Sequence, residues 1–170
     1  MPPIVEHLKH LQFLLKEITV DQVMRESVVT VKATELFSRV VEIMIENEIR
    51  HLPVVDEKGG LMGVVTQRDV YRLVSPRKLR GDEERIGADK IVFKDSYYPR
   101  EALDEFVLYD VMSKNPLSVK RGAPLGESFR LMAEHAIGCL PIVDNLNRVV
   151  GICTRTDILS FTAAVYKMKF

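Results

Sequence analysis

The chain lacks an excess of either charge, because 24 lysines and arginines are matched by 24 aspartates and glutamates. Proteins that bind nucleic acid or anionic membranes through a broad surface usually carry a clear positive excess. We therefore expect no nucleic-acid partner and no membrane partner. Any phosphorylated ligand must be held by locally placed groups.

Cysteine is scarce as well. Cys139 and Cys153 are the only two, and they suit neither a metal-ligand spacing nor a disulfide framework. Both lie in apolar surroundings, which favours buried thiols and a reducing, cytoplasmic setting. No apolar run approaches the roughly 18–20 residues needed to span a bilayer. Charges interrupt the N-terminal stretch, so we expect no secretory signal there.

Familiar catalytic motifs are also missing. The sequence contains no G-x-S-x-G, H-E-x-x-H, P-loop or G-x-G-x-x-G. His7 and His10 have a helical i, i+3 spacing, which suits either a weak metal site or a solvated helix face. We expect no catalytic residues, no metal and no required cofactor, and therefore not an enzyme.

What the chain does contain is an internal repeat. A shift of 88 positions brings two long stretches into register without a gap. The first copy reads VMRESVVTVK, MIENEIRHLPVVD and GVVTQRD, and the second reads VMSKNPLSVK, MAEHAIGCLPIVD and GICTRTD. Because the identities spread along both copies, they indicate one structural unit used twice.

Both copies show the same order of hydrophobic patterns. A short extended stretch is followed by a helical pattern, with Leu36, Val40, Ile43, Met44 and Asn47 on one side in the first copy. Two strands joined by an acidic turn come next, and a helix then begins at Thr66 in the first copy and at Thr154 in the second. We predict an α+β fold in which two β-α-β-β-α repeats pack as a pseudo-two-fold pair.

Segments outside the repeats have their own character. An amphipathic N-terminal helix should place its apolar stripe either on its own domain or on a second copy of the chain. The segment between the repeats mixes both charges with an apolar IVF, and we expect a partly ordered surface excursion. The predicted segments are an N-terminal helix at 1–19, repeat 1 at 20–74, the excursion at 75–106, repeat 2 at 107–162 and a tail at 163–170.

The motif Gly-x-x-Thr-x-x-Asp closes each copy. Its glycine allows close approach of a bulky group to the backbone. Thr66 and Thr154 place a hydroxyl and free N–H groups at a helix start, which suits a phosphate. Asp69 and Asp157 would instead accept hydrogen bonds from ribose hydroxyls. The same side chains would also form a capping box that merely stabilises the helix end, and both interpretations stay open.

Taken with the upstream S/T-V-K and L-P-h-V-D elements, this motif resembles the CBS-domain family over roughly 20–74 and 108–162. The resemblance implies a two-repeat module with two clefts between the repeats. Such modules commonly bind adenine nucleotides or related adenosyl compounds, form homodimers and regulate separate partners. AMP, ADP, ATP and S-adenosylmethionine are the implied regulatory ligands.

The family's site positions carry over to both copies. In the first, Thr66 and Asp69 would hold phosphate and ribose, Thr30 and Lys32 would border the base, His51 and Pro53 would form an apolar wall, and Arg68 would add a cation. In the second, the corresponding residues are Thr154, Asp157, Ser118, Lys120, Cys139, Pro141 and Arg155. The arginines would otherwise be solvated charges, and the lysines ordinary strand-end residues. Because the two sets differ, different occupancy is expected.

Three functions remain open at this point. The first is a sensor of an adenosyl ligand that passes its signal to a separate, unknown effector protein. The second is a ligand-independent dimerisation or docking module, in which the capping boxes are only caps. The third is an enzyme built on the excursion, against which the absence of a paired nucleophile and base argues.

Overall fold

The computed structural model describes residues 3–79 and 87–167 of the chain. The chain divides into two compact units, and one of them is built from two separate stretches of the sequence. The central unit is Val29–Pro116, and the terminal unit combines Met1–Val28 with Leu117–Phe170. The N-terminal helix therefore belongs to the unit that contains the second repeat.

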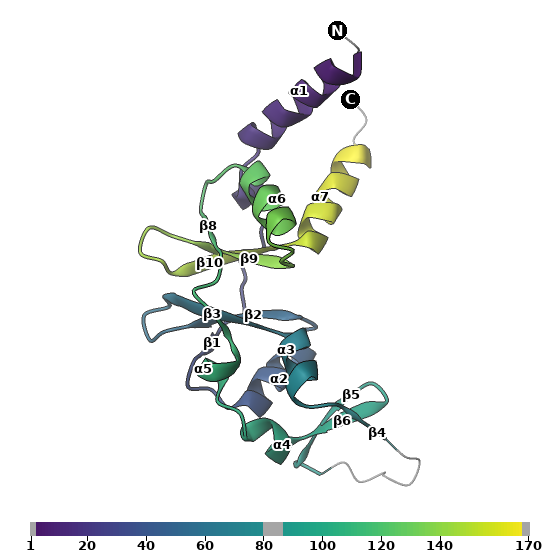
Figure 1. The fold of residues 1–170 in the computed structure, drawn as a ribbon, viewed down its shortest axis with the longest axis vertical. Helices are drawn as coiled ribbons and strands as arrows, with labels where there is room; N and C mark the ends of the chain where they lie inside the picture. Colours follow the sequence, from purple (N-terminus) through teal and green to yellow (C-terminus); the bar gives the residue numbers. More distant parts are fainter. Residues whose placement is uncertain (1–2, 80–86, 168–170) are drawn as a thin grey trace. The chain divides into compact units, whose positions relative to one another are not determined.

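The central unit is built on a mixed sheet with strand order β1-β2-β3-β7. Strand β1 runs parallel to β2, and the β2–β3 hairpin and the β3–β7 pair are antiparallel. Helices α2 and α3 lie on one side of this sheet (Figure 1). Its elements are β1 (Val31–Lys32), α2 (Phe37–Glu46), β2 (His51–Val55), β3 (Leu61–Thr66), α3 (Gln67–Leu73), β4 (Arg77–Lys78), β5 (Lys90–Phe93), β6 (Ser96–Pro99), α4 (Arg100–Asp104), α5 (Leu108–Val111) and β7 (Ser113–Lys114).

The terminal unit repeats this plan on a three-stranded sheet of order β10-β9-β8. Strands β8 and β9 are parallel, and β9 and β10 form an antiparallel hairpin. Helices α6 and α7 lie on one side of the sheet (Figure 1). Its elements are α1 (Pro3–Glu17), η1 (Val20–Gln22), β8 (Val119–Lys120), α6 (Leu125–Glu134), β9 (Cys139–Val143), β10 (Val149–Thr154) and α7 (Arg155–Lys167).

The predicted β-α-β-β-α order is confirmed in both repeats, as β1-α2-β2-β3-α3 and β8-α6-β9-β10-α7. Apolar spacing explains it, since α2 buries Phe37, Val40 and Met44 against the sheet. Leu36 departs from the expectation. It is the N-cap residue of α2, and it is 60% exposed because it stands before the helical stripe begins.

Acidic turns close both hairpins. The carboxylate of Asp56 accepts hydrogen bonds from the backbone N–H groups of Lys58 and Gly60, each at 2.8 Å. These bonds favour the ionised form and lower the pKa of Asp56. Asp144 does the same with the N–H groups of Leu146 and Arg148, at 2.9 Å each. The aspartate after each strand therefore fixes the turn that sets the hairpin register.

The segment between the repeats forms a small antiparallel sheet of order β4-β6-β5. Its apolar face joins the central core through Ile91 and Tyr98, which are 6% and 3% exposed. Much of its predicted charge, including Arg80 and Glu83, lies outside the described residues. The described strands thus add core to repeat 1, which the charge pattern alone did not indicate.

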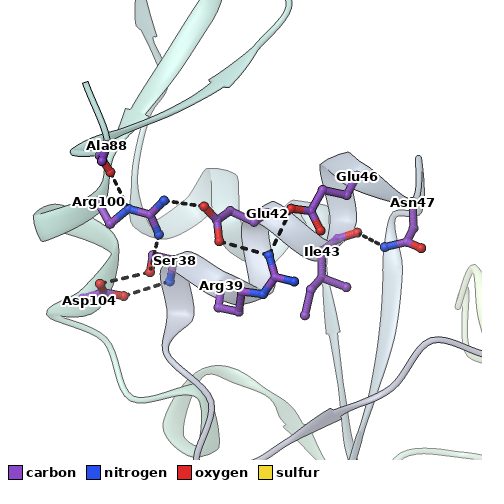
Figure 2. Close-up of polar contacts among 9 residues, drawn as sticks. All are labelled: Ser38, Arg39, Glu42, Ile43, Glu46, Asn47, Ala88, Arg100 and Asp104. Atoms are coloured by element: carbon purple, nitrogen blue, oxygen red, sulfur yellow. Dashed lines mark hydrogen bonds and ion pairs between the residues drawn. The ribbon is translucent and has the colours of Figure 1, made fainter. Parts of the chain in front are cut away.

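Side chains of α4 fasten this added sheet to helix α2 (Figure 2). Arg100 forms an ion pair with Glu42 and donates from Nε to the carbonyl oxygen of Ala88 at 2.8 Å. Asp104 accepts from the backbone N–H of Ser38 at 2.9 Å and from its hydroxyl at 3.0 Å. Because Leu36 cannot cap α2, the carboxylate of Asp104 satisfies the helix start from another part of the chain.

Candidate functional site

Strand register gathers several of the predicted site residues of repeat 1 at one edge of the central sheet. His51 at the start of β2 pairs with Thr66 at the end of β3. The parallel pairing of Val31 with Val54 brings Thr30 beside Pro53, near the same edge. Helix α3 begins directly after Thr66, so Asp69 stands one turn along from this edge. We call this group the repeat-1 edge.

The equivalent group in the terminal unit is the repeat-2 edge. Cys139 at the start of β9 pairs with Thr154 at the end of β10, and α7 follows immediately. Val119 pairs with Ile142, which places Ser118 beside Pro141. The repeat therefore reproduces the edge as well as the sequence motif.

Both edges contain a formed capping box. In repeat 1, Asp69 Oδ2 accepts from the Thr66 N–H at 2.8 Å and from its hydroxyl at 2.7 Å. In repeat 2, Asp157 Oδ2 accepts from the Thr154 N–H at 2.8 Å and from its hydroxyl at 2.5 Å. The capping interpretation is thus realised in both copies. It uses one oxygen of each aspartate, and the other oxygen decides what else the site can bind.

The second carboxylate oxygens of Asp157 and Asp69 differ in their hydrogen-bond partners. Asp157 Oδ1 accepts a hydrogen bond from Arg25 Nε at 2.6 Å, in an ion pair whose aspartate is only 7% exposed. None of the described residues donates to Asp69 Oδ1 within hydrogen-bonding distance. Arg25 was not among the predicted site residues, because its only signal in the sequence is a charge directly after the Val-Met pair of the first copy.

The predicted lysines lie away from these edges. Lys32 is level with Val55, at the far end of the strand from the pairing of His51 with Thr66, and its ammonium pairs with Glu57. Four residues of strand separate the two levels by about 13 Å. Lys120 likewise donates to the carbonyl oxygen of Asp144, at 2.9 Å, in the hairpin turn of repeat 2.

The predicted arginines are exposed in the first turns of their helices. Arg68 lies in the second position of α3. Arg155 folds back and donates from Nε to the carbonyl oxygen of Ile137 at 3.0 Å. Both positions leave a cation near the edge, although Arg155 Nε already donates to the backbone.

Residues predicted as an apolar wall are largely part of the core. Pro53, Pro141 and Cys139 are buried, and His51 is half-buried. Burial raises the pKa of the Cys139 thiol to about 12, and the nearby Cys153 adds to the effect. The pKa of the Cys153 thiol is likewise raised to about 12, by burial and by the charge of Asp157. Both sulfurs are thus held as neutral thiols.

The motif glycines accommodate methionine side chains of the same unit. A Cβ atom on Gly63 would stand 2.5 Å from Met112 Sδ, and one on Gly151 would stand 2.4 Å from Met24 Sδ. The bulky group that approaches each glycine is therefore the methionine of a Val-Met pair. Since Met112 lies among the first residues of repeat 2 and Met24 among the first residues of repeat 1, each repeat packs the leading segment of the other.

A groove on the central unit includes the repeat-1 aspartate. Its volume is about 480 Å³, and Asp69, Arg72, Leu73, Phe106 and Val107 are among the residues that line it. A neighbouring hollow of about 410 Å³ shares Leu73 and Phe106. Most of these residues lie outside the repeated motif, so the internal repeat gave no signal for them.

No helix among residues 3–79 and 87–167 is long and apolar enough to cross a membrane. In the same described ranges, no group of three or more histidine, cysteine, aspartate or glutamate side chains could hold a metal ion.

Known proteins share both the sequence pattern and the fold. A family model described as CBS domain matches residues 20–76 and 108–164. A CBS domain-containing protein of Dictyostelium discoideum is 29% identical over 150 residues, which cover 88% of this chain and 94% of that protein. A homoserine O-acetyltransferase of Methanocorpusculum labreanum is 31% identical over 140 residues, but the chain covers only 23% of it.

Solved structures give the same result for the fold. The CBS domain pair of protein MJ0100, in complex with 5′-methylthioadenosine and S-adenosyl-L-methionine, aligns with a TM-score of 0.66 at 22% identity, over 87% of this chain and 98% of that one. The protein CBSX2 in complex with AMP aligns with a TM-score of 0.66 at 24% identity, over 88% and 98%. With two matched repeats and the fold of these pairs, the chain belongs to the CBS-domain family.

Proposed function

We propose that this chain is a regulatory module that binds an adenine nucleotide or an adenosyl compound at the Thr–Asp edges of its repeats. The observation that carries the proposal is the repeat-1 edge. There, Asp69 keeps one carboxylate oxygen that no described residue bonds, and it lines a groove of about 480 Å³. A carboxylate oxygen is a suitable acceptor for ribose hydroxyls.

The structural relatives support the ligand class. MJ0100 holds two adenosyl compounds and CBSX2 holds AMP, and both align over most of this chain. The neutral thiols of Cys139 and Cys153 argue against cysteine-based catalysis, because the thiolate is the reactive form. We propose a cytoplasmic protein that is not an enzyme, requires no cofactor and signals to a separate effector.

Thermal unfolding of the ligand-free chain with AMP, ADP, ATP, S-adenosylmethionine or NADH tests this function. A ligand at about a hundred times its dissociation constant should stabilise the chain by about 2.7 kcal/mol. That gain corresponds to a rise in Tm of roughly 5–10 °C for a chain of this size. Asp69→Asn should remove the part of the rise that the repeat-1 edge contributes, because the amide replaces one acceptor oxygen with a donor. Asp95→Asn, in an exposed turn of the same unit, should preserve it.

A second function has its own support. Both capping boxes are complete without a ligand, and helix α1 exposes Leu8, Leu11 and Phe13 by 58%, 51% and 56%. These features favour a dimerisation or docking module that forms a homodimer. If none of the five compounds raises the Tm, this second function becomes the better account.

A further inference from the structure

The two repeats offer an internal comparison, because the position after each Val-Met pair is occupied by different residues. The 88-residue shift places Arg25 of the first copy opposite Ser113 of the second. Both residues are held by strand pairing with equivalent partners. Arg25 pairs with Ile152 through two backbone hydrogen bonds of 2.9 and 3.0 Å, and Ser113 pairs with Val64.

Because the backbones are equivalent, the side chains alone distinguish the two aspartates. The long guanidinium of Arg25 reaches Asp157 Oδ1 at 2.6 Å. The side chain of Ser113 makes no hydrogen bond to Asp69 among the described residues. Asp157 is buried and has both oxygens occupied by protein donors. Asp69 is half-buried and bonds protein donors through Oδ2 alone.

A ribose diol needs unoccupied acceptor capacity on the carboxylate that receives it. At the repeat-2 edge, a ligand would have to displace a charge-assisted hydrogen bond, which is among the stronger protein hydrogen bonds. At the repeat-1 edge, no such displacement is needed. One side chain therefore decides whether the second oxygen of the aspartate is available at each edge.

We propose that Arg25 occupies Asp157 as an internal substitute for a ligand, so that the repeat-2 edge is closed and the repeat-1 edge takes the adenosyl ligand. This inference rests on the proposed function and adds to it the identity of the working site. It assigns Arg25 a regulatory role, since any event that moves the guanidinium would open a second site.

Isothermal titration calorimetry of the full chain with the same five compounds measures the number of sites. The native chain should bind one equivalent, and Asp69→Asn should bind none. Arg25→Ser copies the residue of the other repeat and should raise the stoichiometry to two. Ser113→Arg should weaken binding at the repeat-1 edge by about tenfold or more, the usual effect of losing one hydrogen bond to a charged group.

Matched variants control for charge and for folding. Arg130→Ser removes a positive charge from α6 of the same unit, and Ser113→Ala removes the serine hydroxyl without adding charge; each should leave one site with unchanged affinity. If Arg25→Ser disturbs folding, as circular dichroism would reveal, Arg25→Gln removes the charge with less change in packing and carries the same expectation.

The possible failures are distinguishable. Two sites in the native chain, loss of its single site in Asp157→Asn, or weaker binding in Arg25→Ser would overturn the role of Arg25 while leaving the proposed function intact. An unchanged stoichiometry of one in Arg25→Ser and Arg25→Gln would do the same. No binding of any compound to the native chain or to these variants would overturn both.

Discussion

At the scale of single residues, the motif glycines show how a side-chain-free position is used. Gly63 and Gly151 were predicted to allow a close approach, and the approaching groups are Met112 and Met24. The sequence could indicate that space is needed but could not name the occupant, because methionine and glycine are far apart in the chain. The occupant is buried in each case, with Met112 4% and Met24 8% exposed.

Gly63→Ala should therefore destabilise the chain by about 1–3 kcal/mol, since the new methyl group must displace a packed sulfur. Urea unfolding measures the loss. In the double variant with Met112→Ala, the two costs should fall short of additivity by about 1 kcal/mol. Met44→Ala removes another buried methionine of the same unit and should combine additively with Gly63→Ala. Additive costs with Met112→Ala would contradict the contact.

The cysteines allow a second prediction at this scale. Their pKa values of about 12 leave roughly one thiol in ten thousand ionised at pH 8. A thiol reagent such as Ellman's reagent should react slowly with the native chain and rapidly with two thiols after unfolding in urea. Leu146→Cys, at a side chain that is 71% exposed, supplies the accessible control. Fast reaction of the native chain would show that these thiols are not shielded.

At the scale of elements, the α2–α4 junction carries a pH-dependent contribution to stability. Arg100 donates a hydrogen bond to Glu42 and thereby lowers the pKa of that carboxyl. Burial opposes this shift, and a hydrogen bond from Arg39 adds to it. A carboxyl whose pKa is lower in the folded chain stabilises the fold above its unfolded pKa of about 4.3. The contribution is lost as the pH falls through the lower folded value.

Glu42→Gln should therefore cost about 1 kcal/mol at pH 7 and clearly less at pH 3, because the contribution of the ionised carboxyl is lost progressively as the pH falls from about 4.3 toward the lower folded pKa. Urea unfolding at both pH values measures the difference. Glu48→Gln, at an exposed carboxylate just beyond the end of the same helix with no ion pair among the described residues, is the matched control and should cost much less at pH 7. An equal cost at both pH values would mean that Glu42 acts through packing and not through its charge.

The elements themselves were largely predictable, and the reasons are local. Alternating and helical hydrophobic spacing fixed the order of strands and helices, and the repeat confirmed each assignment by a second example. Side-chain contacts were less predictable. Lys32 lies near the turn and pairs with Glu57, which the length of strand β2 could have indicated. Asp104 caps α2 across 66 residues of sequence, and no local pattern signals it.

At the scale of the whole molecule, the chain's units do not coincide with consecutive stretches of sequence. The first residues of repeat 1, up to Val28, belong to the unit that contains the rest of repeat 2, and the first residues of repeat 2, up to Pro116, belong to the unit that contains the rest of repeat 1. The repeat predicted that two equivalent units exist, but periodicity has no information on which copy a leading segment joins. The roles of the predicted site residues, including Arg68 and Arg155, stay predictions until binding is measured.

The proposed homodimer belongs to this scale, and helix α1 is its natural test. The final turn of α1 packs on α6, where a Cβ atom on Gly126 would meet the Leu15 carbonyl oxygen at 3.1 Å. The earlier part of the apolar stripe, with Leu8 and Leu11, is exposed. Exposed leucines at i, i+3 spacing on one helix favour a second apolar surface, and a second copy of α1 offers one.

Leu8→Ser combined with Leu11→Ser should weaken self-association roughly a hundredfold. The two copies together lose four leucines that are each about half exposed, and burying the exposed half of one leucine contributes about 0.75 kcal/mol. Sedimentation equilibrium measures the dissociation constant, and circular dichroism checks that α1 stays helical. Leu146→Ser makes the same change at an exposed turn and should leave association unaltered. A native chain that stays monomeric would contradict the proposed homodimer. A dimer whose dissociation constant is unchanged in the double variant would instead place the interface on another surface, such as that of α7, where Leu159 is 69% exposed.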